Sequence, residues 1–508
     1  MALNDIVFIK GQGGLGRPLE GEDYISGLLI YTANLPTGFT TTNRVKSFGS
    51  VSEAVAAGIK NDYSDATAAT ASYTVTTAGA TGDVAVIKVA DLSTLGATQT
   101  TTLGTYTKAS TDTTTALVAT GIAAAINLET ITHGYTASVT SSTVTITAPK
   151  RFGVYLNSNS PLSVTITGTI AGTLVQFAGG TVSNQALWYY HISEFFRLQP
   201  KGQLYVGFYA VPATYNYVEI QLIQDIAGGK IRQMGVLKGA TQAFSQDAQA
   251  IQAVCTTLAG LHKPLSVVYA AEMQAITDLT TLPDLNTLTC PNVSIVIGQD
   301  GAGQGNYLYL TTLKSITTLG ATLGAIAFSK VSEDIAWISK YNISSGFECD
   351  TIKFANGASV ATQSQSLLNT LDNRRYIFLI KYVGIAGSYF NDSHTAVSVT
   401  SDYAYIENNR TIDKAIRGVY SSLLPNLNSP LVLNADGTLK DTTVAYFIGQ
   451  CAPNLDQMVR DSELSAYQTT IDTTQNVLST STLVVSIVLV PIGVARNIVV
   501  NIGFTLSI

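Results

Sequence analysis

The sequence predicts an α/β and β multi-domain protein, and three observations support this fold class. The chain has 508 residues, more than one hydrophobic core usually accommodates. Between residues 183 and 400, apolar strand-like runs alternate with helical stretches, which is typical of βαβ units around a buried sheet. Residues 66–180 contain 29 Thr and only 8 charged residues, with period-two alternation typical of short strands. We therefore expect four parts along the chain.

The first part, residues 1–65, is expected to hold an N-terminal arm and the start of the core. Short apolar runs such as "IVFIK" and "SGLLIY" are separated by turns that contain Gly and Pro. A short helix is expected at "SVSEAVAAGI", with Ser50 or Ser52 near its N-cap.

The second part, residues 66–182, is expected to be an inserted β-rich domain. Its predicted strands lie in "ASYTVTTAG", "DVAVIKVAD", "YTASVTSSTVTITAP" and "PLSVTITGTI", and one helix is expected at "DTTTALVATGIAAAIN". The abrupt change in composition indicates an insertion into a host fold.

The third and fourth parts, residues 183–400 and 401–508, are expected to be an α/β domain and a C-terminal domain. In the α/β domain, the helix "DAQAIQAVCTTLAGLH" has an apolar face, and Ser245 or Asp247 is expected to cap it. The C-terminal domain is expected to contain the helix "NNRTIDKAIRGVYSSLL", a second helix from "TTVAYFIGQCA" through "LDQMVRDSELSAYQ", and two terminal strands.

Composition argues against several classes of function. Charged residues are 12% of the chain, against about 25% in ordinary proteins, and no basic block suggests nucleic-acid binding. Few charges and many β-branched residues suit a protein that buries much of its surface against other subunits. The four His and four Cys have no metal-ligand spacing, and no catalytic constellation is evident, so we expect no metal, no cofactor and no enzyme activity.

The most apolar stretch, residues 483–495, is shorter than the ~20 residues that a membrane-spanning helix needs. Pro491 and Gly493 interrupt it, so we expect a strand here and no membrane insertion. No signal peptide is expected either.

Two Gly-rich segments resemble nucleotide-binding loops. In the first, the glycines are followed by "RPLEGED", which has no helical apolar period and would repel phosphate, so we expect a flexible arm formed around Gly11, Gly13, Gly14 and Gly16. The second, "GQDGAGQG" at residues 298–305, lacks the Lys and Ser/Thr of a phosphate-binding loop. We interpret it as a surface loop, with a ligand site as the alternative.

The two ends of the chain carry apolar strand patterns. Near the C-terminus one face of a predicted strand is formed by Ile498, Val500, Ile502, Phe504 and Leu506. This strand is either central in its own sheet or intended for another subunit, because an exposed apolar edge recruits foreign strands. A short strand tethered by the Gly-rich arm favours the second interpretation; it comprises Ile6, Val7, Phe8 and Ile9.

Three cations form a stripe on the helix predicted at 408–424. Arg410, Lys414 and Arg417 stand at i, i+4 and i+7. The stripe is either a solvated face or a docking surface for an acidic partner.

Three segments resemble the sheath proteins of contractile phage tails and phage-derived injection machines, in a divergent branch of that family. They are "VFIKGQGGLGRPLEGEDYISGLLIY", "ENNRTIDKAIRGVYSSLLP" and "VLVPIGVARNIVVNIGFTL". The resemblance covers the first ~65 and the last ~110 residues, and it fits the α/β middle more loosely. The Thr-rich region resembles variable domains inserted into phage structural proteins.

The resemblance implies an α/β sheath core with extended N- and C-terminal β arms and a Thr-rich β-domain on the outer surface. It implies a subunit that forms hexameric rings and a helical polymer around an inner tail tube, with baseplate and tail terminator proteins as partners and no direct contact with nucleic acid. The terminal strands would join neighbouring subunits, and Arg410, Lys414 and Arg417 would be candidate tube-facing residues. The particle would be a virion tail or an injection particle, assembled in the bacterial cytoplasm.

Two alternatives stay open. The chain could be another self-assembling shell or surface-array protein, or an α/β enzyme that uses the loop at 298–305.

Overall fold

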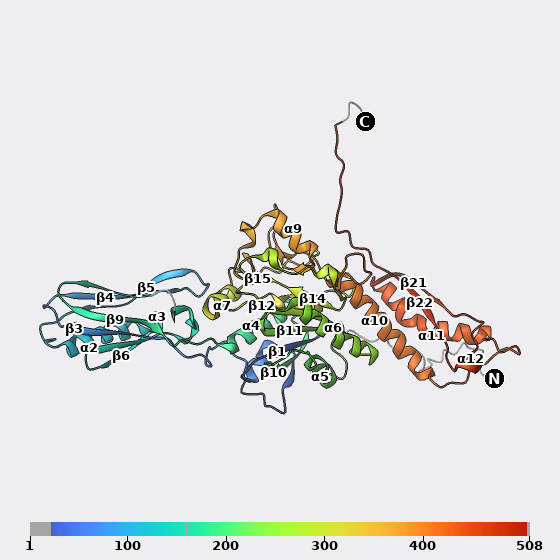
Figure 1. The fold of residues 1–508 in the computed structure, drawn as a ribbon, viewed down its shortest axis with the longest axis horizontal. Helices are drawn as coiled ribbons and strands as arrows, with labels where there is room; N and C mark the ends of the chain where they lie inside the picture. The colour runs from blue at the N-terminus through green and yellow to red at the C-terminus, as the bar shows by residue number, and fades with distance from the viewer. Residues whose placement is uncertain (1–21, 158–160, 505–508) are drawn as a thin grey trace, which may run out of the picture. The chain divides into compact units, whose positions relative to one another are not determined.

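The computed structural model describes residues 22–157 and 161–504 and divides into two compact units. The larger unit comprises Tyr24–Ser329 and Asp334–Ile406, and the smaller unit comprises Glu407–Ile508, Lys330–Glu333 and the segment that ends at Asp23. Figure 1 shows several sheets and many helices, so the mixed α/β, multi-sheet class predicted from the sequence is confirmed.

The larger unit contains a seven-stranded sheet. In spatial order its strands are β17 (Tyr376–Ile377), β14 (Val293–Val296), β12 (Ser266–Glu272), β11 (Gln233–Thr241), β1 (Ile25–Tyr31), β10 (Gln203–Tyr209) and β2 (Val45–Phe48). Neighbouring strands are parallel except for β10 and β2. All seven residues of β1 are buried, as expected for a strand covered on both faces.

Helices cover both faces of this sheet. They are α4 (Asn184–Leu198), α5 (Glu219–Ile226), α6 (Phe244–Gly260) and α8 (Leu319–Phe328). A Cβ atom on Gly235 of β11 would contact α8, whereas one on Gly207 of β10 would contact α5. Gly235 is in register with Val206 through β1, so Gly207, the next residue, faces the opposite side. The βαβ arrangement predicted for this region is therefore present.

The N-cap of α6 is not the residue expected from the sequence. Helix α6 begins after Ala243, and neither Ser245 nor Asp247 occupies its N-cap. Asp247 lies within the first turn, where its carboxylate accepts hydrogen bonds from the Ala243 backbone N–H (3.1 Å) and from the Lys238 ammonium group (2.7 Å). By contrast, Ser50 caps α1 (Val51–Ala56) as expected.

Further elements of this unit lie around the sheet. They are α7 (Gln304–Thr312), α9 (Gln365–Asn373) and three small antiparallel pairs: β13 (Thr289–Cys290) with β20 (Ala396–Val397), β15 (Gly298–Asp300) with β16 (Ile352–Phe354), and β18 (Leu379–Ile380) with β19 (Tyr389–Phe390).

The Thr-rich region forms two antiparallel sheets with a hydrophobic core of its own. One sheet has the order β6 (Thr136–Thr140), β7 (Thr143–Thr147), β3 (Thr70–Thr77), β9 (Ala171–Ala178), and the other has the order β5 (Thr98–Thr107), β4 (Val84–Leu92), β8 (Leu162–Thr167). The predicted helix is α2 (Thr115–Leu128), capped by Thr114 and followed by α3 (Thr130–His133).

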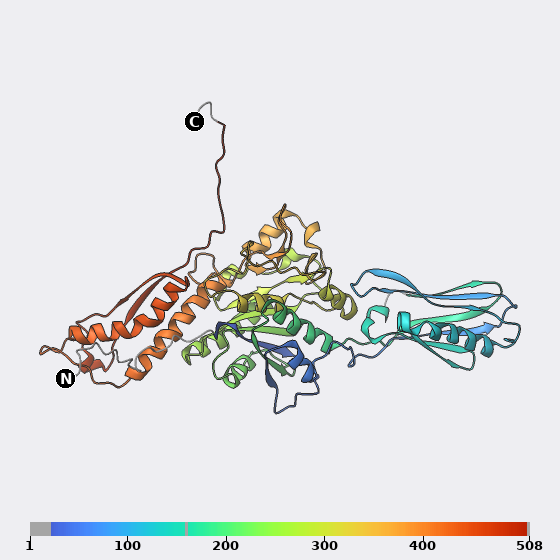
Figure 2. The same ribbon diagram turned by 180° about the vertical axis from the view of Figure 1, so that it is seen from behind.

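The smaller unit is built from two helices and a β-hairpin. Helices α10 (Ile406–Leu423) and α11 (Asp441–Arg460) lie side by side in both views (Figures 1 and 2). Strands β21 (Leu464–Thr470) and β22 (Ser486–Pro491) pair in an antiparallel hairpin, with the short helix α12 (Val477–Thr480) between them. A core centred on Ala415, Leu455, Met458 and Leu464 joins the helices to the hairpin.

The second helix of this unit is shorter than the sequence predicts. Helix α11 ends at Arg460, and Ser462 adopts a positive φ of 59°, which breaks the helical conformation. The segment "LSAYQTT" that follows is strand β21, whereas the sequence interpretation placed it in the helix. The hairpin partner β22 lies within the apolar stretch 483–495 that was expected to be a strand.

Candidate functional site

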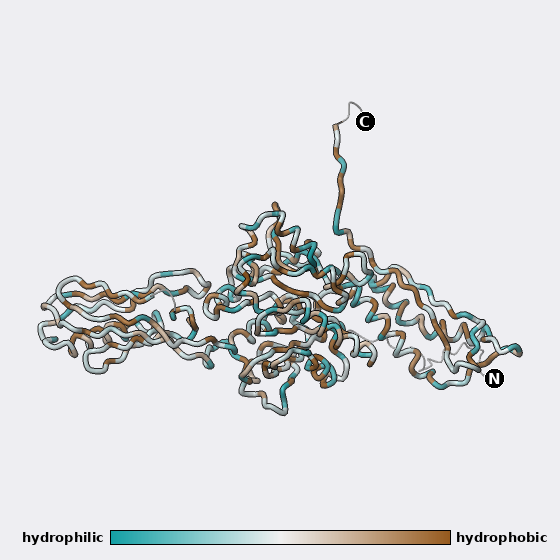
Figure 3. The backbone as a smooth tube through the Cα atoms, viewed as in Figure 1, coloured by the Kyte–Doolittle hydropathy of each residue, from teal (hydrophilic) through white to brown (hydrophobic). Residues whose placement is uncertain are grey.

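The C-terminal segment of the smaller unit exposes a run of apolar side chains. Residues 492–504 follow β22 and have no helical or strand assignment. The exposed fractions of Ile498, Ile502 and Phe504 are 80%, 91% and 111%. Figure 3 shows brown hydrophobic stretches along this extended segment. Such a surface is costly in water, so a partner that covered it would lower the free energy of the segment.

The predicted strand from Ile498 to Leu506 therefore has no pairing partner within the described residues. Its face also includes the exposed Val500, whereas Leu506 lies outside the described residues. Pairing with another subunit would not be visible in a single chain, so that assignment stays a prediction.

An ion pair holds the base of this segment. Arg496 donates from its guanidinium group to the Glu407 carboxylate at 2.5 Å, and the Glu407 side chain is 2% exposed. Because Glu407 lies in the first turn of α10, this contact fixes where the apolar segment leaves the unit.

The β21–β22 hairpin offers two sheet edges. It is a two-stranded sheet, and neither outer edge has a partner strand in the part of the chain that the structure describes. Ile487 and Leu489 of β22 pack against the helices, whereas Val488 and Val490 are 64% and 50% exposed on the other face. Unpaired edges beside an exposed apolar face are suited to strand addition.

The three cations predicted to form a stripe on α10 are largely buried and engaged within the smaller unit. Arg410 is 4% exposed and donates to the Lys330 carbonyl oxygen at 3.1 Å. Lys414 forms ion pairs with Asp23 (2.8 Å) and with Glu463 (2.6 Å). Arg417 forms a third ion pair, with Asp23 at 3.1 Å. The burial and internal pairing of these cations contradict the solvated-face interpretation and do not favour an exposed docking stripe formed by the three cations.

These contacts shift the pKa values of the group. Burial alone would raise the pKa of Asp23, but the positive charges of Lys414, Arg410 and Arg417 bring it below its ordinary value. Burial would lower the pKa of Lys414, but its carboxylate partners raise it. Burial raises the pKa of Glu463, and the ion pair with Lys414 only partly offsets this effect. Asp23 and Lys414 are therefore held in their charged forms.

An apolar stripe that runs from α10 into the turn beginning at Leu424 was not predicted from the sequence. Ile416, Tyr420 and Leu424 are 48%, 37% and 49% exposed, at i, i+4 and i+8. Leu427 continues the exposed apolar surface at 71%. The helical spacing was visible in the sequence, but apolar spacing alone does not distinguish an exposed stripe from a core face.

The surface loop predicted at 298–305 is instead strand β15 followed by a short, partly buried turn into α7, and the chain's own carboxylates bind the amides at the start of that helix. Asp300 accepts hydrogen bonds from the N–H groups of Gly303 (2.9 Å) and Gly305 (3.0 Å), and Glu348 accepts one from Gln304 (2.9 Å). Burial and nearby carboxylates raise the pKa of Glu348 to about 7. A phosphate would find these amides occupied and would face two acidic side chains, so this geometry does not favour the ligand-loop alternative.

The N-terminal predictions lie outside the described residues. They concern the strand Ile6, Val7, Phe8 and Ile9, and the arm glycines Gly11, Gly13, Gly14 and Gly16.

Across residues 22–157 and 161–504, no cluster of three His, Cys, Asp or Glu side chains is arranged to hold a metal ion. In the same residues, no helix combines the length and apolar character needed to cross a membrane.

Together the units define a mixed α/β protein with an exposed apolar segment and open sheet edges in its C-terminal unit. Two family models match the chain: DUF2586, N-terminal domain, over residues 3–394, and DUF2586, C-terminal domain, over residues 402–508. The chain belongs to the DUF2586 family. No curated protein matches it.

Several solved structures are similar to the chain at low identity. The anti-feeding prophage helical sheath in its contracted state is 13% identical with a TM-score of 0.45, covering 63% of this chain and 81% of that one. The contracted sheath complex of an extracellular contractile injection system is 11% identical with a TM-score of 0.42, covering 63% and 80%. The sheath tail protein from Desulfitobacterium hafniense is 12% identical with a TM-score of 0.36, covering 96% and 100%. These belong to the class of proteins that the sequence resembles.

Proposed function

We propose that this chain is the structural subunit of a contractile tail sheath, without catalytic activity. The observation that carries the proposal is the exposed apolar segment 498–504, which follows a hairpin whose two edges lack partner strands in the described residues. A segment with Ile498 at 80% and Ile502 at 91% exposure needs a partner to cover it. A sheet edge of a second copy supplies both backbone hydrogen bonds and apolar contacts.

In this proposal the terminal segments join neighbouring subunits into a mesh. The C-terminal strand of one subunit and the N-terminal strand Ile6–Ile9 of another add to the edges of β21 and β22, and the Gly-rich arm gives the N-terminal strand its reach. Repetition of these heterologous contacts closes six-fold rings and stacks them into a helical polymer around an inner tube. Contraction rearranges the globular domains while the strands keep subunits connected and drives the tube through a target envelope.

In the same proposal, the other domains and helix α10 have the following roles. The Thr-rich residues 66–182 form an inserted domain on the outer surface, whereas residues 183–400 and 401–508 form the sheath core and its C-terminal domain. Helix α10 is the candidate tube-facing element. Its exposed Ile416 and Tyr420 supply the contact area, whereas Lys414 and Arg417 are engaged by Asp23 and hold the helix in place within the smaller unit. Baseplate and tail terminator proteins bind the two ends of a polymer that assembles in the bacterial cytoplasm.

The test of the proposal is assembly of the purified chain, expressed alone and with its genomic neighbours, observed by negative-stain electron microscopy. The full chain is expected to form hollow cylinders with six-fold end views, filled when the tube protein is present. Deletion of residues 497–508 should leave folded subunits that do not polymerise, and normal cylinders from this truncation would contradict the mesh assignment.

A matched pair of substitutions separates strand pairing from general damage to the segment. Ile502→Lys places a charge on the apolar face of the predicted strand, whereas Asn501→Lys places the same charge on the opposite face. Assembly should be lost in the first variant and retained in the second. Equal behaviour of the two variants would mean that the segment does not pair as a strand.

The second candidate function is that of another self-assembling shell or surface-array protein. The same exposed segment would join its subunits. Flat sheets, or cylinders without six-fold end views that exclude the tube protein, would favour this candidate.

A further inference from the structure

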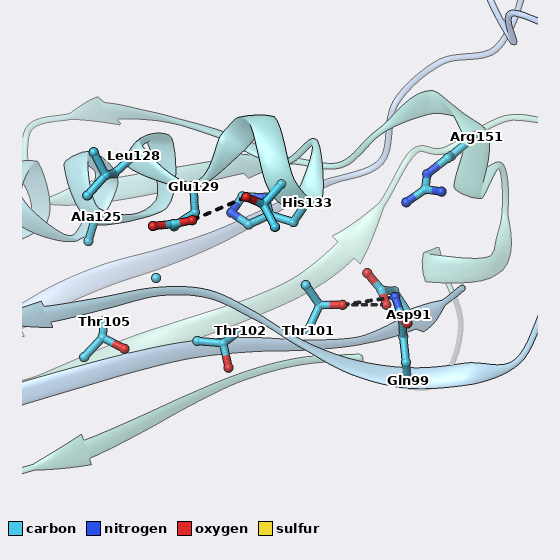
Figure 4. Close-up of a pocket in the computed structure, with 12 residues that line it drawn as sticks. Asp91, Gln99, Thr101, Thr102, Thr105, Ala125, Leu128, Glu129, His133 and Arg151 are labelled. Atoms are coloured by element: carbon cyan, nitrogen blue, oxygen red, sulfur yellow. Dashed lines mark hydrogen bonds between the residues drawn. The ribbon is translucent and has the colours of Figure 1, made fainter. Parts of the chain in front are cut away.

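A cavity with both polar and apolar lining lies in the Thr-rich region of the larger unit, whereas the proposed assembly surface belongs to the smaller unit. Its volume is about 600 Å³, within the range of small-molecule sites. Figure 4 shows it between two walls: strand β5 contributes Gln99, Thr101, Thr102 and Thr105, and the α2–α3 segment contributes Ala125, Leu128, Glu129 and His133. Asp91, Gly104, Thr132 and Arg151 complete the lining.

The buried part of the lining is held in place by hydrogen bonds. Asp91 is 1% exposed, and its carboxylate accepts from the hydroxyl groups of Thr101 (2.9 Å) and Tyr135 (3.1 Å). The Nδ1 atom of His133 accepts from the Tyr135 backbone N–H (3.0 Å), so Nε2 carries the proton and donates to the Leu103 carbonyl oxygen (3.0 Å). These contacts fix the shape of the wall before any ligand arrives.

The exposed part of the lining supplies the groups that can contact a ligand. Thr102 and Thr105 offer hydroxyl groups. The Thr132 hydroxyl donates to the Glu129 carboxylate (3.4 Å) and the Gln99 amide donates to the Thr101 hydroxyl (3.3 Å), and Glu129 and Gln99 keep further acceptor and donor positions for a ligand. The Arg151 guanidinium group stacks over the Phe152 ring at 4.7 Å, which orients its donors. Leu128 is 80% exposed and adds an apolar patch to the rim.

This combination of groups selects a class of ligand. Two carboxylates and one guanidinium leave no dominant charge, which disfavours a strongly anionic or cationic ligand. Planar carboxylate, amide and guanidinium groups each form paired hydrogen bonds with adjacent hydroxyl groups, and threonine hydroxyls act as donor or acceptor. A neutral sugar presents adjacent hydroxyls together with apolar C–H faces, and the latter match the Leu128 side chain. The cavity also has the capacity for more than one sugar ring.

We propose that this cavity binds a neutral carbohydrate, with Glu129, Gln99 and Arg151 as the principal hydrogen-bonding residues and Leu128 as the apolar contact. This activity is separate from assembly, so its failure would leave the proposed function standing. It gives the Thr-rich region a role in contacting glycans.

The test uses the full chain on a printed array of neutral, sialylated and sulfated oligosaccharides, followed by titration calorimetry with the neutral glycan that gives the strongest signal. Neutral glycans are expected to bind. Glu129→Gln removes a charged acceptor from an exposed position and is expected to weaken binding about tenfold or more.

A matched pair of variants locates the binding. Ala125 lines the cavity, whereas Ala124 lies beside it on α2 and does not. Ala125→Phe should fill the cavity and abolish binding, while Ala124→Phe should bind as the unchanged protein does, with circular dichroism confirming that both fold. Absence of any bound glycan, equal binding by the two Phe variants, or binding restricted to sialylated and sulfated glycans would each overturn the proposal.

Discussion

A buried histidine gives a sharp prediction about how the stability of the larger unit depends on pH. His191 lies in α4 with 0% exposure, and neither of its ring nitrogens has a hydrogen-bond partner within the described residues. Burial lowers its pKa from 6.5 to about 4. The unfolded chain therefore takes up a proton on His191 at a pH where the folded chain does not.

The direction and the size of this pH dependence follow from the difference between the pKa of His191 in the folded chain and in the unfolded chain. The pKa of His191 is lower in the folded chain than in the unfolded chain. The contribution of neutral His191 to the free energy of unfolding is therefore fully present above pH 6.5 and decreases as the pH falls from 6.5 toward 4. Two pKa values of 6.5 and about 4 give a loss of about 2 kcal/mol between about pH 8 and about pH 5. His191→Leu should remove this loss. It should also stabilise the unit at neutral pH by about 1 kcal/mol, because no buried nitrogen is left unpaired.

The assay can report on this unit alone. The chain has two Trp residues: Trp188 is buried in α4 against Phe208 of β10, with 4.8 Å between ring centroids, whereas Trp337 is 50% exposed. In a Trp337→Phe background, urea unfolding followed by fluorescence therefore reports the environment of α4. The free energy of unfolding would be measured at about pH 8 and about pH 5, for the Trp337→Phe protein and for the same protein with His191→Leu.

His262→Asn is the control, because His262 is exposed and has a positive φ of 58° that Asn tolerates. This variant should keep the full pH dependence. If His191→Leu loses as much stability on acidification as the parent does, the pH dependence comes from other groups and the reasoning fails.

Three further substitutions test local packing and hydrogen bonding. Gly320→Ala should destabilise the larger unit by about 1–3 kcal/mol, because a Cβ atom on Gly320 of α8 would overlap the His191 carbonyl oxygen of α4. The fluorescence assay measures this change, and an unchanged urea midpoint would contradict the close approach of the two helices. Gly449→Ala, in α11 with no neighbouring atom within 4 Å of the new Cβ, should instead stabilise the smaller unit by up to about 1 kcal/mol, measured by thermal unfolding. Asp300→Asn should lower the free energy of unfolding of the larger unit by about 2–3 kcal/mol, because the fully buried Asp300 carboxylate accepts hydrogen bonds from the amides at the start of α7 and the variant lacks its charge. Proteolysis near Gly303 should become faster. A variant as stable as the parent would show that this charge is dispensable.

The central sheet could be predicted because its signal is local. Parallel strands covered on both faces give continuous apolar runs, as in β1 and β12, and these runs are visible without knowledge of their partners. The strand order is a different matter. Strand β1 lies between β10 and β11, which follow it by about 170 residues or more, and no local pattern contains that information.

The hairpin of the smaller unit shows how local patterns fail. Ala466 pairs with Val490, and this pairing decides that residues 464–470 form a strand. The helical pattern of the preceding segment continues past Arg460 without a Gly or Pro, so the sequence predicts a longer helix. Ser462 adopts its positive φ in a local C-terminal turn of α11, closed by the Glu463 N–H donating to the Met458 carbonyl oxygen (2.8 Å) and the Ser462 N–H donating to that of Val459 (3.1 Å). Glycine is the usual residue at this position, so a serine there gives no compositional signal.

The environment of the charged residues could not be predicted from the sequence for a related reason. The spacing of Arg410, Lys414 and Arg417 correctly predicts one helix face, but it does not reveal that Asp23, 391 residues before Lys414, neutralises that face. Likewise, the glycines at 298–305 suggest an open loop, while Glu348 reaches it from a distant segment. Spacing predicts orientation on an element, whereas the environment depends on contacts that are remote in sequence.

If the two ends of the chain join different neighbours, as proposed above, the ion pairs of α10 have a mechanical consequence. Asp23, at the end of the N-terminal segment, is tied to Lys414 and Arg417, and Arg496, at the base of the C-terminal segment, is tied to Glu407. The two attachment points stand seven to ten residues apart on one helix, which is about 10–15 Å. Tension applied to one end would therefore pass to the other through a short length of helix, leaving the seven-stranded sheet outside the path of the force.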